Sequence, residues 1–304
     1  MATQPRIPPD QTERKTQVAV QLHGGLGNQM FQAAAGLALA ERLGASLLFD
    51  TSRFRDKGLR AYALSAFALS AKVLHETPTP LAALRRAILK GMGRKSATQP
   101  NYWRGRFYRE PHFHFDPGFT HLAGDTMIAG YFQSPHYFAG YESHIALVLA
   151  PEKLMSNAAL HLAEILNGEA SVAIHLRRGD FAADPKAAAV HGVLDWSYYD
   201  RAVAHIRAQQ PEARFFVFSD NPEAAAEGAA RWPNAEPMAG TSAGDDLFLM
   251  SRARHHIIAN SSFSWWSCWL DRREGGIRIA PEQWFAAGNP QETRDLCPPE
   301  WLRL

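Results

Sequence analysis

The feature that most constrains the fold is the alternation of apolar runs with helical segments in the second half of the chain. The runs SVAIHL, ARFFVFSD, HHIIAN and IRIAP have the composition of buried strands, and segments such as WSYYDRAVAHIRAQQ and GDDLFLMSRAR separate them. Parallel strands need such crossover helices, so the alternation predicts a parallel sheet with helices on both faces. Ligands of these sheets bind at the carboxyl ends of the strands, which makes that edge the expected place for a functional site.

The beginning of the chain predicts a second unit of the same kind. VAVQL is strand-like, MFQAAAGLALAERLG is helical up to Gly44, and ASLLFD resumes a strand. Two such halves predict an α/β protein with two Rossmann-like domains that face each other across a cleft. The expected boundaries are a flexible tail over 1–16, an N-terminal domain over 17–150 and a C-terminal domain over 151–304, whose last helix is expected to reach back to the N-terminal domain.

The turn between the first strand and the first helix, HGGLGNQMFQ, contains three glycines beside an Asn-Gln pair. Such turns bring backbone N–H groups and a helix N-terminus toward an anion or a sugar. A dinucleotide fingerprint needs a third small residue where Met30 stands, although Asp50 lies where a ribose-binding acid is expected. The turn alone therefore leaves two interpretations open, a ligand site and a simple change of chain direction.

The composition narrows the classes of function. The formal net charge is +2 and 20% of the residues are charged, so an anionic ligand needs a local cluster and nucleic acid is not an expected partner. Cys268 and Cys297 cannot build a disulfide framework and lack the spacing of zinc ligands. This cysteine usage fits the reducing cytoplasm, which is the expected location, and the polar, proline-rich N-terminus resembles neither a signal peptide nor a membrane anchor.

The stretch from Thr51 to about Glu110 is expected to be irregular, apart from a basic helical segment over 81–95. A basic amphipathic helix either lies on a membrane surface or forms a solvated face. Peripheral membrane contact therefore stays open as a prediction, and stable membrane insertion is not expected.

Polar residues follow three strands of the predicted C-terminal sheet. The residues after these strands are His175, Arg177, Arg178 and Asp180, then Ser219 and Asp220, then Asn260, Ser261 and Ser262. Adjacent arginines suit a diphosphate, because their guanidinium groups form forked hydrogen bonds, but a salt-bridge network with carboxylates is the alternative. Asn and Ser at a helix start either cap the helix or bind phosphate through the same N–H groups.

Three tryptophans, Trp265, Trp266 and Trp269, fall on one predicted helix, and the first and last share a face. Aromatic residues at this spacing are usually core, so packing is favoured over stacking on a base or sugar. Tyr131, Phe132 and Gln133 precede a proline turn, and packing is favoured for them as well.

Five motifs resemble those of the family 11 glycosyltransferases, the bacterial-type galactoside α-1,2-fucosyltransferases. They are GGLGNQMFQ, GYFQSPHYF, HLRRGD, HGVLDWSYYDRA and DLFLMSRARHHIIANSSFSWW, in this order between Val18 and Trp284. HLRRGD is similar to the HxRRxD signature shared by α-1,2-, α-1,6- and protein O-fucosyltransferases. The resemblance implies a two-domain GT-B fold, GDP-β-L-fucose as donor, a β-galactoside-terminated glycan as acceptor, inversion at the anomeric carbon, and neither a metal nor another cofactor.

The resemblance also assigns roles to residues. Arg177 would bind the β-phosphate and stabilise departing GDP, and His175 and Asp246 would recognise guanine. The turn from Gly24 to Asn28 would face donor and acceptor. The implied catalytic residues are Arg177, Asn28 and His23, and the implied donor-binding residues are His175, Arg177, Arg178, Asp180, Ser219, Asp220, Asp246, Asn260, Ser261, Ser262, Phe263, Gly25 and Gly27.

The chain departs from the family pattern at some positions. MFQAAAG replaces a motif in which an aromatic residue often follows the Gln, and SRARHH replaces one that often carries cysteine. The residue at His23 varies in the family, so the general base is not assigned even though histidine titrates in a suitable range. The alternatives are a fucosyltransferase of another linkage, a nicotinamide-dependent oxidoreductase, against which Met30 argues, and a non-catalytic protein that binds a sugar nucleotide.

Overall fold

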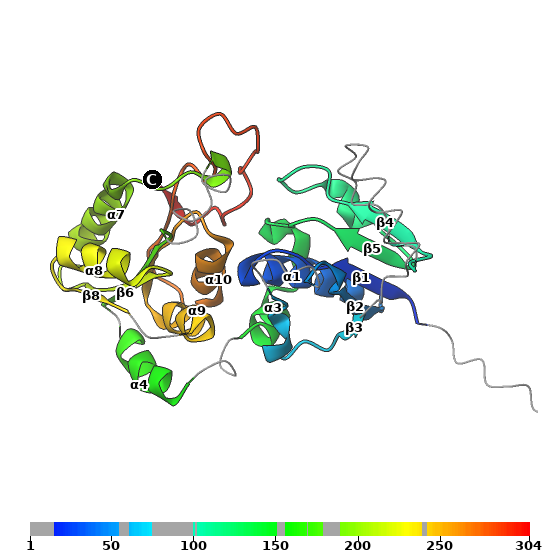
Figure 1. The fold of residues 1–304 in the computed structure, drawn as a ribbon, viewed down its shortest axis with the longest axis horizontal. Helices are drawn as coiled ribbons and strands as arrows, with labels where there is room; N and C mark the ends of the chain where they lie inside the picture. The colour runs from blue at the N-terminus through cyan, green and yellow to red at the C-terminus, as the bar shows by residue number, and fades with distance from the viewer. Residues whose placement is uncertain are drawn as a thin grey trace, which may run out of the picture.

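The computed structural model contains two parallel β-sheets, each packed with helices, that lie side by side (Figure 1). It describes residues 15–54, 61–74, 100, 102–150, 156–168, 170–178, 189–238 and 242–304. The predicted fold class, an α/β protein of GT-B type with two Rossmann-like units, is confirmed. Nearly all of the expected flexible tail and the whole basic segment over 81–95 lie outside the described residues.

The C-terminal sheet has the strand order β11-β10-β9-β6-β7-β8. Its strands are β6 (Ser171–Leu176), β7 (Arg214–Ser219), β8 (Ala235–Pro237), β9 (His255–Ile257), β10 (Arg278–Ala280) and β11 (Leu302–Arg303), and all of their pairings are parallel. The chain first moves outward from β6 to β8 and then crosses to the other side of β6. The order of a doubly wound dinucleotide-binding sheet is the same, and its ligands bind where the direction reverses, here between β6 and β9.

The N-terminal sheet has the order β3-β2-β1-β5-β4 and is also parallel. Its strands are β1 (Gln17–Gln21), β2 (Ser46–Asp50), β3 (Lys72–Leu74), β4 (Arg106–Arg109) and β5 (Thr126–Ala129). The winding direction reverses between β1 and β5. The expectation that the stretch from Thr51 to Glu110 is irregular was wrong for β3 and β4, because these short strands lie at the two edges of the sheet and carry no long apolar run.

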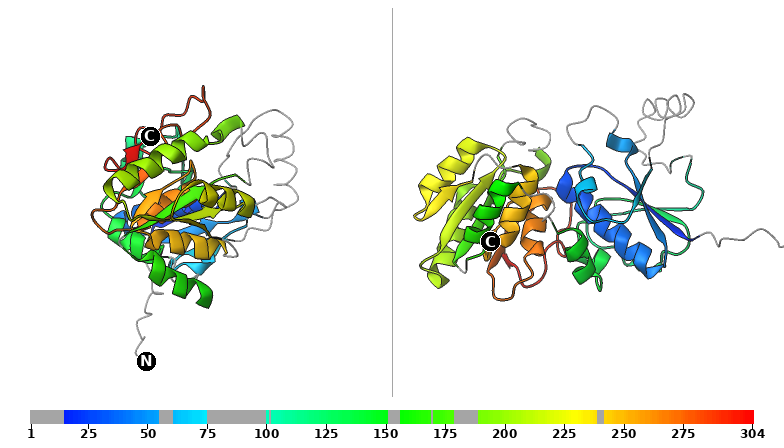
Figure 2. Two further views of the ribbon diagram at one scale, coloured as in Figure 1. Left: turned by 90° about the vertical axis from the view of Figure 1, so that its left-hand side faces the viewer. Right: turned by 90° about the horizontal axis from the view of Figure 1, so that it is seen from below.

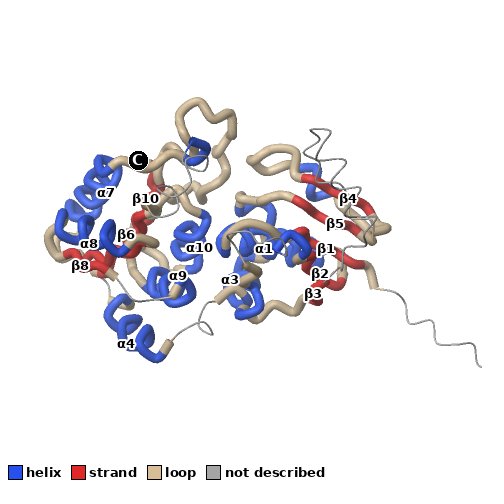
Figure 3. The backbone as a smooth tube through the Cα atoms, viewed as in Figure 1, coloured by secondary structure: helices blue, strands red, loops and turns tan. Residues whose placement is uncertain are grey.

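The helices of the C-terminal sheet cover both of its faces, as Figure 3 shows. In the described parts of both halves the α-helices are α1 (Leu26–Arg42), α3 (Glu142–Val148), α4 (Asn157–Leu166), α7 (Trp196–Gln209), α8 (Pro222–Arg231), α9 (Ala243–Arg252) and α10 (Ser262–Leu270). The short 3-10 helices are η1 (Ser52–Phe54), η2 (Leu64–Ala66), η3 (Pro117–His121) and η4 (Pro135–Phe138). Among the described helices, none is both long and apolar enough to cross a bilayer.

Polar side chains fix where these helices begin. Ser156, Asp195, Asn221, Ser242 and Ser261 each accept a hydrogen bond from a backbone N–H in the first turn of the helix that follows. Such caps satisfy N–H groups that have no partner inside the helix. Three of these caps lie close behind β7, β8 and β9, so helix starts collect at the carboxyl edge of the C-terminal sheet.

One hydrophobic core joins the two sheets through α1 and α10. Trp265 and Trp266 are both 0% exposed, and their ring centroids lie 4.4 and 4.9 Å from that of Phe31 on α1. Trp266 also stacks on Phe138 of η4, and Trp269 packs edge-on against the same ring. The preference for core packing of the three tryptophans is therefore confirmed.

The two helices touch where both begin, and a glycine makes this contact possible. A Cβ atom on Gly27 would lie 2.4 Å from the carbonyl carbon of Ser262 and 2.5 Å from the nitrogen of Phe263. The indole Nε1 of Trp266 donates a buried hydrogen bond of 3.0 Å to the carbonyl of Gly27. Gly27 therefore serves the contact between α1 and α10, and its expected part in donor binding is not needed to explain it.

We predict that Gly27→Ala destabilises the protein, because the added methyl group meets backbone atoms that cannot rotate away. Overpacking of this kind costs about 1–3 kcal/mol of unfolding free energy. Gly168→Ala is the matched control, since among the described residues its Cβ would approach a single atom, the carbonyl oxygen of Ile165 at 3.3 Å. Urea unfolding of both variants measures the difference, and equal stability of the two would show that α10 can move away from α1 without cost.

Candidate active site

The two places where the winding direction reverses lie close to the junction between the sheets. β1 leads through the glycine-rich turn into α1, and β9 leads through Asn260 and Ser261 into α10. Because α1 and α10 touch at their N-termini, the carboxyl edges of β1 and β9 are brought to the same region. The right-hand view of Figure 2 shows the two sheets side by side from a further direction, and in the left-hand view one lies behind the other.

Asn28 links three of the sequence motifs by hydrogen bonds. Its Oδ1 accepts a bond of 2.7 Å from Gln133 Nε2 and a bond of 2.8 Å from Ser262 Oγ. Gln133 belongs to the loop after β5, and Ser262 is the first residue of α10. A Cβ on Gly24 would lie 2.7 Å from Nδ2 of Asn28, and the backbone φ of Gly24 is +81°, so a glycine is needed at this position.

Arg177 lies directly after β6, where the winding direction of the C-terminal sheet reverses. Its Nη1 donates to the backbone carbonyl of Asn260 at 3.2 Å. Asn260 is 3% exposed and donates from Nδ2 to the carbonyl of His191 at 2.8 Å. Asn260 thus holds the segment at His191 next to Arg177. The side-chain amide of Asn260 is engaged in this contact between segments.

His175 is the last polar residue of β6, a strand that is buried on both of its faces. It is 7% exposed, and its ring centroid lies 5.8 Å from that of Phe263. Its pKa is lowered from 6.5 to about 4, mainly by burial, while Asp220 opposes the shift and the nearby Arg177 adds to it. His175 is therefore a neutral imidazole at neutral pH, and its buried Nδ1 has no partner within the described part of the chain.

The serines at the start of α10 have separate tasks. Ser261 Oγ accepts from the N–H of Phe263 at 3.3 Å and caps the helix, whereas Ser262 Oγ donates to Asn28. The capping interpretation is correct for Ser261. It does not exclude phosphate binding, since further N–H groups of the first turn point the same way.

Several residues expected in the site have structural partners. The guanidinium carbon of Arg178 lies 4.4 Å from the ring centroid of Trp196, and its Nη2 donates to the carbonyl of Leu194 at 3.3 Å. Asp220 Oδ1 accepts from the backbone N–H of Arg178 at 3.2 Å, and Ser219 Oγ accepts from a backbone N–H two residues later. These contacts explain the three side chains without a ligand.

The remaining expected residues are placed as follows. Asp50 is 0% exposed and accepts from Gln21 Nε2 and from the N–H of Ser52, so it is not available as a ribose-binding acid. Asp246 is half-buried in the first turns of α9, and Gly25 is the extended residue that precedes α1. Asp180 lies outside the described residues.

Glu110 is a site candidate that the sequence did not reveal, since it follows the unrecognised strand β4. Its carboxylate accepts from the backbone N–H groups of Tyr131 at 2.7 Å and Phe132 at 3.1 Å. Its pKa is raised from 4.5 to about 7 because the effect of burial exceeds the opposing effect of these N–H groups. Phe132 has a φ of 54°, so Glu110 holds a loop with an unfavourable backbone conformation.

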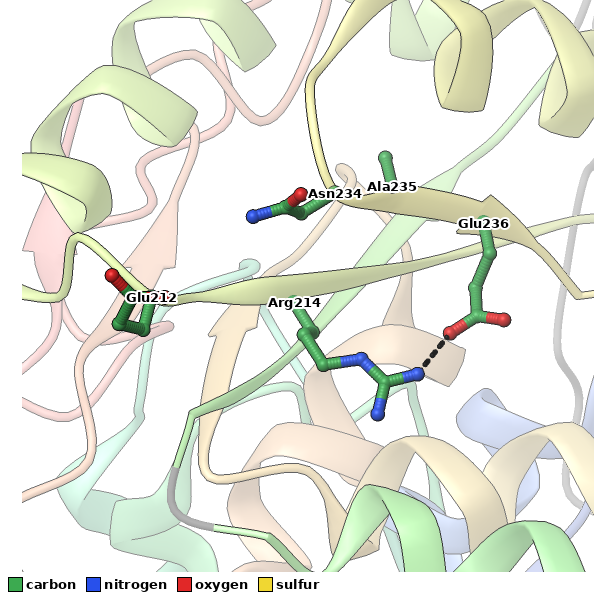
Figure 4. Close-up of a pocket in the computed structure, with 5 residues that line it drawn as sticks. All are labelled: Glu212, Arg214, Asn234, Ala235 and Glu236. Atoms are coloured by element: carbon green, nitrogen blue, oxygen red, sulfur yellow. Dashed lines mark hydrogen bonds and ion pairs between the residues drawn. The ribbon is translucent and has the colours of Figure 1, made fainter.

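A shallow pocket lies at the opposite edge of the C-terminal sheet (Figure 4). It is lined by Glu212, Arg214, Asn234, Ala235 and Glu236, and an ion pair of 3.0 Å joins Arg214 to Glu236. These residues start β7 and β8 or precede them, whereas ligands of parallel sheets bind at the carboxyl ends. The pocket is therefore separate from the candidate site.

Comparison with known proteins gives concordant matches. The family model described as glycosyl transferase family 11 matches residues 2–304. An alpha-1,2-colitosyltransferase of Escherichia coli is 31% identical over 298 residues, which cover 94% of this chain and 98% of that protein. The O-antigen biosynthesis glycosyltransferase WbnK of Escherichia coli is 29% identical and covers 93% and 99%. The crystal structure of the fucosyltransferase NodZ from Bradyrhizobium has a TM-score of 0.47 at 13% identity, covering 84% of this chain and 91% of that one.

The lowered pKa of His175 predicts a loss of stability in mild acid. The unfolded chain binds a proton near pH 6.5, whereas the folded protein does so only near pH 4. The contribution of His175 to the free energy of unfolding is therefore complete above pH 6.5 and is lost as the pH falls toward 4. The full shift of the His175 pKa corresponds to a difference in unfolding free energy on the order of 3 kcal/mol.

Urea unfolding of the wild-type protein and of His175→Gln, near neutral pH and near pH 5, measures this contribution. The difference in unfolding free energy between them should shrink in acid. Other groups, including Glu110 with its opposite shift, are present in both proteins and cancel in the difference. A difference that does not change with pH would mean that folding does not lower the pKa of His175.

Proposed function

The chain belongs to glycosyl transferase family 11, and on this premise we propose that it transfers L-fucose from GDP-β-L-fucose to the 2-hydroxyl of a β-galactoside at the end of a glycan. The observation that carries the proposal is the set of hydrogen bonds at Asn28, which joins the glycine-rich turn, the loop after β5 and the start of α10. A transferase needs donor and acceptor held together, and this junction combines elements of both sheets.

In the proposed reaction the acceptor oxygen forms a bond to C1 of fucose while the bond from C1 to the β-phosphate oxygen breaks. The electron pair of that bond stays on GDP, so negative charge grows on the diphosphate. Arg177, held beside Asn260, and the N-terminal turn of α10 would stabilise this charge as fixed donors. Attack from the side opposite the leaving group accounts for inversion at the anomeric carbon.

Guanine recognition is assigned to His175 and Asp246 in this proposal. A carboxylate accepts well from the N1–H and N2–H donors of guanine, and a neutral His175 can donate or accept without repelling Arg177. Both residues lie near the carboxyl edge of the C-terminal sheet, His175 on β6 and Asp246 near the start of α9. The donor would thus occupy the C-terminal half and the acceptor the N-terminal half.

GDP-colitose is a second candidate donor, because one relative is an alpha-1,2-colitosyltransferase. Colitose is L-fucose without its 3-hydroxyl group, so one site could serve either sugar with the same linkage. A site that hydrogen-bonds the 3-hydroxyl discriminates against the sugar without it by about 10⁴–10⁵ in kcat/KM, whereas an apolar site discriminates by only about 10² against an added hydroxyl.

The test is a GDP-release assay with both donors and a panel of β-galactosides, followed by linkage analysis of the product. A galactoside without its 2-hydroxyl is the matched control and should accept no sugar. Transfer to another hydroxyl would overturn the α-1,2 assignment alone. GDP binding without turnover on any acceptor would support a non-catalytic binding protein, and binding of a nicotinamide cofactor would support an oxidoreductase.

We predict that turnover does not depend on a metal ion, because fixed donors at Arg177 and α10 can stabilise the leaving diphosphate. The rate in excess EDTA should equal the rate without it. Loss of activity that Mn²⁺ or Mg²⁺ restores would contradict this prediction.

We predict that Arg177→Lys folds normally but loses most of its turnover, since lysine keeps the charge and loses the planar fork. Removal of one fixed donor to a developing negative charge costs about 2.7–4 kcal/mol, or roughly a hundredfold to a thousandfold in kcat. The loss falls on kcat as well as on KM because the charge grows along the reaction.

Arg214→Lys is the matched control for this experiment, because Arg214 lies at the opposite edge of the sheet, where it pairs with the exposed Glu236 and lies over the ring of Phe216. Melting temperature and kinetics are measured on the same samples. A lower melting temperature with near-normal kcat for Arg177→Lys would show that Arg177 is structural.

A further inference from the structure

Gln32 on α1 has an amide whose orientation the backbone fixes. The side chain is 0% exposed. Its Oε1 lies 3.0 Å from the backbone nitrogen of His23, and its Nε2 lies 3.1 Å from the carbonyl oxygen of Gly130. A backbone N–H can only donate and a carbonyl can only accept, so exchange of the amide oxygen and nitrogen would break both bonds.

The fixed amide determines where His23 carries its proton. Gln32 Nε2 lies 3.1 Å from His23 Nδ1, and because this amide nitrogen can only donate, Nδ1 must accept with its lone pair. The other neighbour of Nδ1 is the carbonyl of Gln21 at 3.4 Å, which would require a proton on Nδ1. That contact is at the limit of hydrogen bonding and is the weaker one. In the neutral ring the proton therefore lies on Nε2.

The surroundings of His23 also favour the neutral ring. Burial and the positive charge of Arg53 together lower its pKa from 6.5 to about 4, against a smaller opposing effect of the Gln21 carbonyl. A neutral ring with Nδ1 already bonded has no free lone pair. It can donate a hydrogen bond from Nε2, but it cannot take a proton from an acceptor hydroxyl.

Tyr131 packs beside His23 in the loop after β5, where the winding direction of the N-terminal sheet reverses. Its ring centroid lies 4.6 Å from that of His23, and the residue is 43% exposed. Its backbone N–H is held by the carboxylate of Glu110 at 2.7 Å. An exposed aromatic face beside an uncharged N–H donor suits a sugar, which offers both C–H groups and hydroxyl oxygens.

We propose that Gln32 is a positioning residue that holds His23 as a neutral hydrogen-bond donor to a hydroxyl of the acceptor sugar, so that His23 is not the general base. The nature of the ligand rests on the proposed function. The protonation of His23 does not, because it follows from hydrogen bonds within the chain.

Nitrogen-15 NMR of the protein without substrate tests the protonation directly. Long-range proton–nitrogen correlations at neutral pH should show a protonated Nε2 and an unprotonated Nδ1 for His23, assigned by the signals missing from His23→Gln. Gln32→Met, which removes the amide donor, should shift the proton toward Nδ1, a change that loss of stability alone does not produce. A proton on Nδ1, or on both nitrogens, in the wild-type protein would overturn the proposal.

Kinetics of two variants test the role in transfer. His23→Phe keeps a ring without an N–H and should raise the acceptor KM roughly 3- to 10-fold with little change in kcat, as expected for one neutral hydrogen bond. His23→Gln offers an amide N–H and should restore most of the loss. If His23 is the general base, kcat falls about 10²- to 10⁴-fold in both variants, which would overturn the proposal. If the protein gives the predicted NMR signals but transfers no sugar, the proposed function and the sugar ligand are refuted. The protonation of His23 on Nε2 still holds in that case.

Discussion

The contact between the starts of α1 and α10 is the constraint on which the site depends. The bond from Trp266 to the carbonyl of Gly27 and the absence of a side chain at Gly27 let the two helices approach to backbone distance. The functional residues of a parallel sheet lie at its carboxyl edge. Two sheets whose carboxyl edges lay apart would therefore form two separate sites. The helix contact joins the edge that follows β1 to the edge that follows β9, and Asn28 then bonds to both Gln133 and Ser262.

The polar groups around this junction are held largely by the backbone. Gln32, Asn260 and Glu110 each bond to main-chain atoms of a neighbouring loop, and they fix the segments that carry His23, His191 and Tyr131. The buried His175 and the half-buried His23 both have lowered pKa values, so they add no positive charge beside Arg177 and Arg53. The described part of the site therefore combines fixed, uncharged hydrogen-bonding groups with the positive charges of Arg53 and Arg177.

The sequence predicted the fold well where strands are long and apolar, as at β6 and β7, and failed at β3 and β4, which are short edge strands. The predicted strand ends did come together around Arg177 and Ser262. Arg178 and Asn260 could not be separated from ligand-binding residues in advance, because their partners, the Trp196 ring and the carbonyl of His191, are set by tertiary packing. Met30 argued against a nucleotide fingerprint, yet the close contact of helix and strand is made by Gly36, whose Cβ would lie 2.2 Å from a methyl carbon of Val20.

The core that spans both sheets also affects how such a chain can be recombined. Trp265, Trp266 and Trp269 follow β9 in the sequence, but much of the surface that buries them comes from Phe31 and Phe138 in the N-terminal half. A chimera that takes its two halves from different relatives must therefore keep matching partners for these indoles, or large aromatic surfaces become exposed to water. The two halves can be exchanged independently only when this aromatic pairing is exchanged or preserved as a unit.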